Sequence, residues 1–192
     1  MIEVEIKLPV GEPEELKRRL PELGFREGKR VREEDLYFNS DFHDFRKSDE
    51  ALRIRRVQNL NTGESHAFLT YKGPKLDQIS MTRKELETGI EDMDVMREVL
   101  RALGYVKQYP VNKVRRYFEK ENVTACLDEV EGLGFFMELE VLVSEEKDRE
   151  EALSTLKETS RLLGHSMDET TRTSYLTMLM RKDGVPGAEC EE

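Results

Sequence analysis

The sequence predicts an α+β fold built on eight mostly antiparallel strands, and three observations support this prediction. Eight segments alternate between apolar and polar residues, which is the period of strands that place one face on a hydrophobic core. Segments with helical spacing follow the first and the fifth of these strands, and others lie near the end of the chain. The first half of the chain also resembles the second half, which indicates a duplicated unit.

The first strand sets the pattern for the others. Its apolar face carries Ile2, Val4, Ile6 and Leu8, and its charged face carries Glu3, Glu5 and Lys7. Two carboxylates followed by an ammonium group, on so apolar a strand, suggest a metal ion held beside an anion.

The remaining elements follow from periodicity and from the residues that end helices and strands. Gly73-Pro74 is expected to break a strand, and residues 61–64 are expected to form a hairpin turn. The expected strands are 1–8, 29–39, 51–60, 65–72, 79–89, 111–120, 123–130 and 135–143, and the expected helices are 12–23, 93–103, 148–163 and 171–181. Residues 1–181 are thus expected to form one domain, followed by a disordered tail over residues 182–192.

Matching residues recur at a nearly constant offset in the two halves. Glu3 and Glu5 match Glu85 and Glu87, 82 positions later, and Gly24 matches Gly104, 80 positions later. This similarity suggests two four-strand halves related by a pseudo-two-fold axis. Two such halves can close into an eight-stranded barrel with a polar interior, although an open sheet with one face in water has the same periodicity.

Composition excludes several classes of protein. The 192 residues carry a net charge of −10, which argues against broad binding to nucleic acid or to an anionic membrane. No apolar stretch approaches the roughly 20 residues of a membrane span. The two cysteines, Cys126 and Cys190, lie far apart, as in a reduced protein. We therefore expect a cytoplasmic protein without nucleic-acid or membrane partners, and we leave open whether it forms a homodimer.

The charged faces of the strands combine carboxylates with bases. Arginine binds phosphate oxygens in a bidentate fashion and lysine acts as a point charge, whereas Mg²⁺ or Mn²⁺ requires carboxylate oxygens. A lining that holds both therefore fits a metal ion bound with a triphosphate. A single strand of this kind is more often a solvated sheet face, so the interpretation depends on its recurrence along the whole chain. His43, His66 and His165 do not cluster, and we expect them on the surface.

In order along the chain, these motifs resemble those of the CYTH superfamily, the triphosphate tunnel metalloenzymes. The resemblance covers about residues 1–180 and is strongest to class IV adenylyl cyclases and thiamine triphosphatase-type proteins. Its motifs are Glu3-Val4-Glu5-Ile6-Lys7, Asp35-Leu36-Tyr37-Phe38, Arg53-Ile54-Arg55, Tyr71-Lys72-Gly73-Pro74, Arg83-Lys84-Glu85-Leu86-Glu87, Lys113-Val114-Arg115, Leu127-Asp128, Glu138-Leu139-Glu140 and Ser174-Tyr175-Leu176. Asp49-Glu50 departs from the family pattern, in which a small residue is common at this place, and it bears on the loop at the tunnel mouth.

The resemblance implies a closed eight-stranded antiparallel barrel with helices outside and a role for each matching residue. Metal, as Mg²⁺ or Mn²⁺, would be held by Glu3, Glu5, Glu138 and Glu140, with Asp128 assisting. The phosphates would be bound by Lys7, Arg53, Arg55, Lys72, Arg83, Lys113 and Arg115. Glu85, Glu87 and Asp35 would play secondary roles, with both glutamates on the tunnel floor. Tyr37 and Lys72 would form a catalytic polar pair near the reacting phosphate.

The implied activity is that of a metal-dependent enzyme acting on a nucleoside triphosphate or another triphosphate. One version is an adenylyl cyclase that converts ATP to cyclic AMP and pyrophosphate, and the alternative is an inorganic or thiamine triphosphatase that releases orthophosphate. The same lining serves both reactions. A non-catalytic nucleotide or polyphosphate binder is disfavoured because both carboxylate pairs and Asp128 are intact. An open-sheet RNA-binding or protein-binding module is disfavoured by the net charge and by the lack of aromatic pairs on the basic strands.

Overall fold

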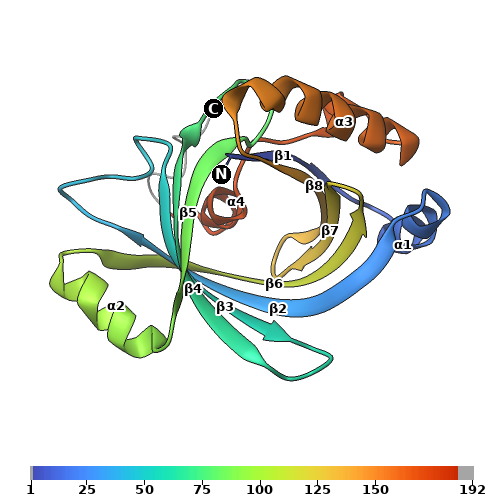
Figure 1. Cartoon of the computed structure of the whole chain (residues 1–192). Coiled ribbons are helices and arrows are strands. Elements are labelled where there is room, and N and C mark those ends of the chain that lie inside the picture. The colour runs from blue at the N-terminus through green and yellow to red at the C-terminus, as the bar shows by residue number, and fades with distance from the viewer. Residues whose placement is uncertain (1, 186–192) are drawn as a thin grey trace.

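A computed structural model describes residues 2–185 and shows a closed barrel of eight antiparallel strands (Figure 1). Around the barrel the strands follow the order β1-β5-β4-β3-β2-β6-β7-β8, and β8 pairs with β1 to close it. The predicted α+β class and closed barrel are confirmed, and the open sheet is ruled out. No helix in the described residues is long and apolar enough to span a membrane.

The elements have the following bounds. The strands are β1 (Ile2–Pro9), β2 (Arg26–Asn39), β3 (Ala51–Asn59), β4 (Ser65–Lys75), β5 (Arg83–Ile90), β6 (Val106–Lys120), β7 (Val123–Val130) and β8 (Gly134–Val143). The α-helices are α1 (Pro13–Glu22), α2 (Met93–Ala102), α3 (Arg149–Leu162) and α4 (Tyr175–Lys182), and two 3₁₀ turns are η1 (Glu146–Asp148) and η2 (Met167–Glu169).

The strand order agrees with the predicted duplication. Exchanging β1 with β5, β2 with β6, β3 with β7 and β4 with β8 leaves the order around the barrel unchanged, read in the opposite direction. A two-fold axis that passes between β1 and β5, and between β2 and β6, has this effect. Gly24 after α1 and Gly104 after α2 adopt nearly the same left-handed φ, +88° and +89°. Glycine reaches this conformation without steric cost, so each helix ends at its matching position.

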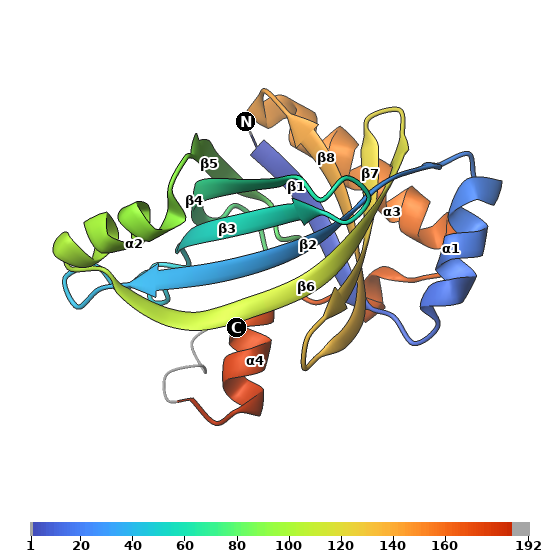
Figure 2. The same ribbon diagram turned by 90° about the horizontal axis from the view of Figure 1, so that it is seen from below.

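Apolar side chains on the outer face of the barrel pack under the helices. The largest cluster joins β1, β7 and β8 to α1 and α3, and includes Ile6, Leu139, Leu20 and Leu156, all fully buried. Burying one such side chain contributes roughly 1.5–3 kcal/mol, so this face must stay outside under its helices. The alternation of the strands then turns the charged face inward. A second cluster places α2 on the other side of the barrel, opposite α1 (Figure 2).

Helix α4 lies below β6 in Figure 2. Tyr175 and Leu179 pack against Val111, Val130 and Phe136. The helix starts after Ser174, whose side chain accepts a hydrogen bond from the Thr177 N–H. The predicted helix begins at residue 171, but residues 171–173 precede this cap and are not helical. Of the predicted tail 182–192, Lys182 is the last residue of α4, and residues 186–192 lie outside the described residues.

Several strand boundaries differ from the prediction, and β2 and β6 begin earlier than expected, at Arg26 and Val106 rather than at residues 29 and 111. Gly73-Pro74 does not break β4, which continues to Lys75, because a register shift between Lys72 and Lys75 accommodates the pair as a bulge. Strand β5 begins only at Arg83, since Ser80 is bound to Asp77 and forms part of a loop. The Met81 N–H of this loop donates to the Glu5 carbonyl, so the loop extends the short seam between β1 and β5.

Candidate active site

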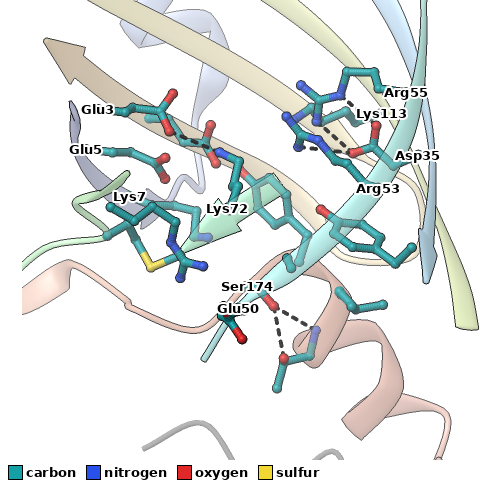
Figure 3. A pocket seen from close by; sticks show the side chains of 18 of the residues that line it. Glu3, Glu5, Lys7, Asp35, Glu50, Arg53, Arg55, Lys72, Lys113 and Ser174 are labelled. Carbon is teal, nitrogen blue, oxygen red and sulfur yellow. Dashed lines mark hydrogen bonds and ion pairs between the residues drawn. The ribbon is translucent and has the colours of Figure 1, made fainter. Parts of the chain in front are cut away.

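The barrel encloses a cavity lined by charged side chains from seven of its strands (Figure 3). Alternate residues of each strand point inward, so the charged faces of the separate motifs meet in one space. The charged and aromatic residues that line it are Glu3, Glu5, Lys7, Asp35, Tyr37, Arg46, Glu50, Arg53, Arg55, Lys72, Arg83, Lys113, Arg115, Glu138, Glu140 and Tyr175. The cavity therefore contains every residue predicted to bind phosphate and four of the five predicted to bind metal.

Three carboxylates converge on one side of the cavity. Glu3, Glu5 and Glu140 each offer an oxygen atom, and these atoms all lie within 4.8 Å of one another. Strand pairing causes this, because Glu5 lies opposite Glu140 in the β1–β8 register. We call these three residues the carboxylate cluster.

Negative charge predominates in the carboxylate cluster, although Lys72 lies 3.0 Å from Glu3 and Arg115 lies 3.1 Å from Glu140. Burial, followed by repulsion from Glu138 and Glu3, raises the pKa of Glu5 to about 7. Burial also raises the pKa of Glu140 to about 8, against the attraction of Arg115 and with further repulsion from Glu3 and Glu138. A divalent cation would compensate for this excess of negative charge, and oxygen ligands at this spacing fit Mg²⁺ or Mn²⁺. The residues present therefore fit the metal that the sequence implies.

The other two predicted metal ligands bind Arg115 instead. Arg115 Nε and Nη2 donate to Asp128 at 2.7 and 2.6 Å, Nη2 also donates to Glu138, and Nη1 donates to Glu140 at 3.1 Å. Burial would raise the pKa of Glu138, but Arg115 and Lys113 lower it. Asp128 and Glu138 thus fix a guanidinium group at the edge of the carboxylate cluster.

A second ion-pair network crosses the cavity wall from β2 to β6. Arg55 forms a bidentate pair with Asp35 at 2.6 and 2.7 Å, and its Nη1 lies 2.8 Å from Glu33. Lys113 lies 3.2 Å from Glu33 and Arg53 lies 3.6 Å from Asp35. Burial would raise the pKa of Glu33, but Arg55 and Lys113 lower it well below its usual value. Removing one partner of such buried pairs leaves an uncompensated charge, so the network fixes the positions of its bases.

Glu33 is a site residue that the sequence did not single out. It faces inward in β2 and is 1% exposed. The alternation of the strand already placed it on the charged face, but nothing in the sequence distinguishes it from an acid in water. Tyr175 was also missed. Its hydroxyl donates to Asp128 at 3.1 Å, and its ring lies 4.5 Å from Lys7 Nζ and 5.3 Å from Lys113 Nζ. Only the packing of α4 on the barrel brings this ring to the cavity.

Three residues with predicted roles, Tyr37, Lys72 and Glu87, have contacts that differ from the prediction. Lys72 Nζ lies 3.0 Å from Glu3 and 2.9 Å from Glu85, and within the described chain no hydrogen bond joins it to Tyr37. Tyr37 lines the cavity opposite Arg53 in the β2–β3 register. Glu85 pairs with bases as expected, but Glu87 is exposed near the outer end of β5 and accepts a hydrogen bond from Thr70 at 2.8 Å.

Comparison with known proteins identifies the family. The family model described as the CYTH domain matches residues 1–175. The chain belongs to the CYTH family. It is 42% identical over 178 residues to "Putative adenylate cyclase MJ0240" of Methanocaldococcus jannaschii, covering 93% of this chain and 98% of that protein. It is 26% identical over 146 residues to the adenylate cyclase CyaB of Aeromonas hydrophila, covering 76% and 71%.

Solved structures share the CYTH fold. The PH1819 protein of Pyrococcus horikoshii OT3 is 41% identical, has a TM-score of 0.86, and is matched over 94% of this chain and 99% of that chain. A Hippeastrum protein, whose structure is described as revealing a dominant triphosphatase activity, is 20% identical with a TM-score of 0.62, over 99% of both chains. The resemblance deduced from the ordered motifs is thus confirmed for the family and the fold.

Proposed function

We propose that this CYTH protein is a metal-dependent enzyme that acts on a triphosphate, and that it is an adenylyl cyclase of the class IV type. The observation that carries the proposal is the meeting of the carboxylate cluster with eight bases in one cavity. A metal ion and a triphosphate need these two sets side by side. The adenylate cyclase names of the relatives from Methanocaldococcus jannaschii and Aeromonas hydrophila support the choice of reaction.

The bases of the cavity would bind the triphosphate. Arg53, Arg55 and Arg115 are oriented by carboxylates before any substrate arrives, so little ordering is needed when the phosphates bind. Lys7 and Lys113 flank the Tyr175 ring and would place point charges on the phosphate oxygens. Positioning of this kind, rather than a covalent intermediate, would provide most of the acceleration.

Glu3, Glu5 and Glu140 would hold Mg²⁺ or Mn²⁺. When bound, the ion would neutralise phosphate charge and favour deprotonation of the attacking hydroxyl or water. The three carboxylates must lose their protons to serve as ligands. Lys72, which lies 3.0 Å from Glu3, would keep that carboxylate turned towards the cluster.

A triphosphatase is the second candidate. The bases and carboxylates would bind a triphosphate in the same way whether a ribose hydroxyl or a water molecule attacks. The Hippeastrum protein, which shares the fold, is described with a dominant triphosphatase activity, so the experiment must include this reaction.

Product analysis tests the proposal. Purified protein would be incubated with Mg²⁺ or Mn²⁺ and, separately, with ATP, thiamine triphosphate and inorganic tripolyphosphate. Cyclic AMP with pyrophosphate from ATP is the expected result. Orthophosphate from tripolyphosphate or thiamine triphosphate, without cyclic AMP, would replace the cyclase with a triphosphatase. Tight binding without turnover of any substrate would refute both and indicate a non-catalytic binder.

A further inference from the structure

Glu50 differs from the other carboxylates that line the cavity. It ends the loop between β2 and β3 and lines the cavity beside Ala51. Its carboxylate accepts hydrogen bonds from the hydroxyl groups of Ser48 and Tyr71, and it lies 2.6 Å from the His43 ring, which is charged only when protonated. Throughout residues 2–185, no lysine or arginine nitrogen lies within 4.0 Å of it.

Four of the other five acids that line the cavity lie within 4.0 Å of a lysine or arginine nitrogen, and the fifth, Glu5, belongs to the carboxylate cluster. Asp35 binds Arg55, Glu138 binds Arg115, and Glu3 binds Lys72. Hydrogen bonds from Ser48 and Tyr71 outweigh the effect of burial and lower the pKa of Glu50 to about 2. Glu50 is therefore an ionised carboxylate, held in one orientation by uncharged donors, whose charge no arginine or lysine in the described chain neutralises.

Glu50 lies away from the ion-pair network and from the carboxylate cluster. Figure 3 shows it beside Ser174, away from Arg55 and Lys113 on one side and from Glu3 on the other. The cavity wall also contains apolar side chains, namely Ala51, Met81, Leu176 and Met180, of which Leu176 and Met180 belong to α4 with Tyr175. We call Glu50 and these four residues the outer subsite. The carboxylate cluster and the ion-pair network make up the inner part of the cavity.

The outer subsite is unsuited to phosphate. A phosphate group there would face a fixed negative charge that has no lysine or arginine nitrogen of the described chain within 4.0 Å, and like charges repel strongly where water is partly excluded. An uncharged organic group would bury apolar surface against Met81 and Leu176, and its N–H or O–H groups could donate to Glu50. The outer subsite therefore favours an uncharged organic group over a phosphate.

We propose that Glu50 selects the group carried at the outer end of the triphosphate, favouring an uncharged organic group that donates hydrogen bonds over a terminal phosphate. The protein then distinguishes organic triphosphates from inorganic polyphosphate. This inference rests on the proposed function, because it requires the triphosphate to occupy the inner part of the cavity.

Binding to two non-cleavable probes tests the inference. In both probes methylene groups replace the bridging oxygens of the triphosphate, and one probe carries adenosine whereas the other is inorganic. Their affinities would be measured by calorimetry in Mg²⁺ for the full chain and for Glu50→Gln. We expect Glu50→Gln to bind the inorganic probe roughly three- to ten-fold more tightly, the order that Coulomb's law gives for one nearby charge. Affinity for the adenosine probe should not rise, so the ratio of the two affinities should change in favour of the inorganic probe.

Two further variants make the test specific. Glu98→Gln removes one exposed negative charge from α2 and should leave both affinities unchanged. Tyr71→Phe removes one donor that holds Glu50 and should move the ratio in the same direction by a smaller factor, which keeps the test informative even if Glu50→Gln does not fold. An unchanged ratio in the folded variants overturns the inference. Failure of the unmodified protein to bind either probe would instead overturn the proposed function.

Discussion

Strands β1 and β5 occupy equivalent positions in the two halves of the barrel and carry matching glutamates, yet these glutamates have different surroundings. Glu3 and Glu5 of β1 belong to the carboxylate cluster, whereas Glu85 of β5 pairs with Lys72 and Arg53, and Glu87 is exposed. The difference follows from strand pairing. Strand β1 pairs with β8, which brings Glu5 opposite Glu140, whereas the equivalent partner of β5 is β4, which places Lys72 opposite Glu85 and Thr70 opposite Glu87. A carboxylate pair can become a metal site only where the neighbouring strand supplies the third ligand.

Loss of a cluster carboxylate should have the largest effect. Glu5→Gln keeps the size of the side chain but removes a ligand charge, so metal-dependent turnover should fall by at least about 100-fold. Steady-state kinetics with the substrate found by product analysis measures this, and circular dichroism verifies the fold. Full activity in a folded Glu5→Gln variant would show that the metal assignment is wrong.

Glu85→Gln should affect stability rather than metal binding. The carboxylate lies 2.9 Å from Lys72 and 3.6 Å from Arg53, and its loss should lower the free energy of unfolding by about 1–3 kcal/mol at pH 7. Burial would raise the pKa of Glu85, but Lys72 and Arg53 lower it. Because the folded pKa is below that of the unfolded chain, about 4.3, the stabilisation is present above that pH and is lost as pH falls.

Urea denaturation at several pH values checks this prediction. The difference between the unmodified protein and Glu85→Gln should shrink below about pH 4, where the unfolded carboxylate takes up a proton. A difference that stays constant down to pH 3 would mean that the ion pairs of Glu85 do not stabilise the fold.

Alanine substitutions at the two matching glycines compare the equivalent helix ends of the two halves. Alanine at Gly24 or Gly104 is forced into a left-handed conformation, which costs roughly 1–2 kcal/mol. A Cβ at Gly104 would also lie 3.1 Å from the Phe42 ring, whereas one at Gly24 would lie 3.8 Å from Lys120. Gly104→Ala should therefore have the lower melting temperature of the two. Equal melting temperatures would mean that the Phe42 ring moves aside without cost.

Glu87→Gln should have the smallest effect. The side chain is exposed, and the amide oxygen of glutamine can still accept the hydrogen bond from the buried Thr70 hydroxyl, so the free energy of unfolding should change by less than about 0.5 kcal/mol. Turnover should stay within about two-fold of the unmodified protein. A loss comparable to that of Glu5→Gln would place Glu87 in the active site and remove the distinction between the two strands.

The sequence predicted those features that depend on alternation within one strand. Because side chains alternate, it correctly assigned Glu5, Arg55 and Glu140 to one face, and the order of the motifs led to the family and the closed barrel. It did not reveal that Asp128 binds Arg115 or that Glu33 joins Arg55 to Lys113, because those contacts depend on the register between strands. The contact of Tyr175 with Asp128 depends on the docking of α4, which leaves no periodic signal.

The pairing of β1 with β8 determines when the carboxylate cluster can form. Glu3 and Glu5 precede Glu140 by 135 residues or more and therefore leave the ribosome well before it. Closing a loop of this length carries a large entropic cost that only the completed barrel repays. Two of the three carboxylates are thus synthesised well before the third, so the nascent chain can assemble the carboxylate cluster only after β8 has been made and has paired with β1.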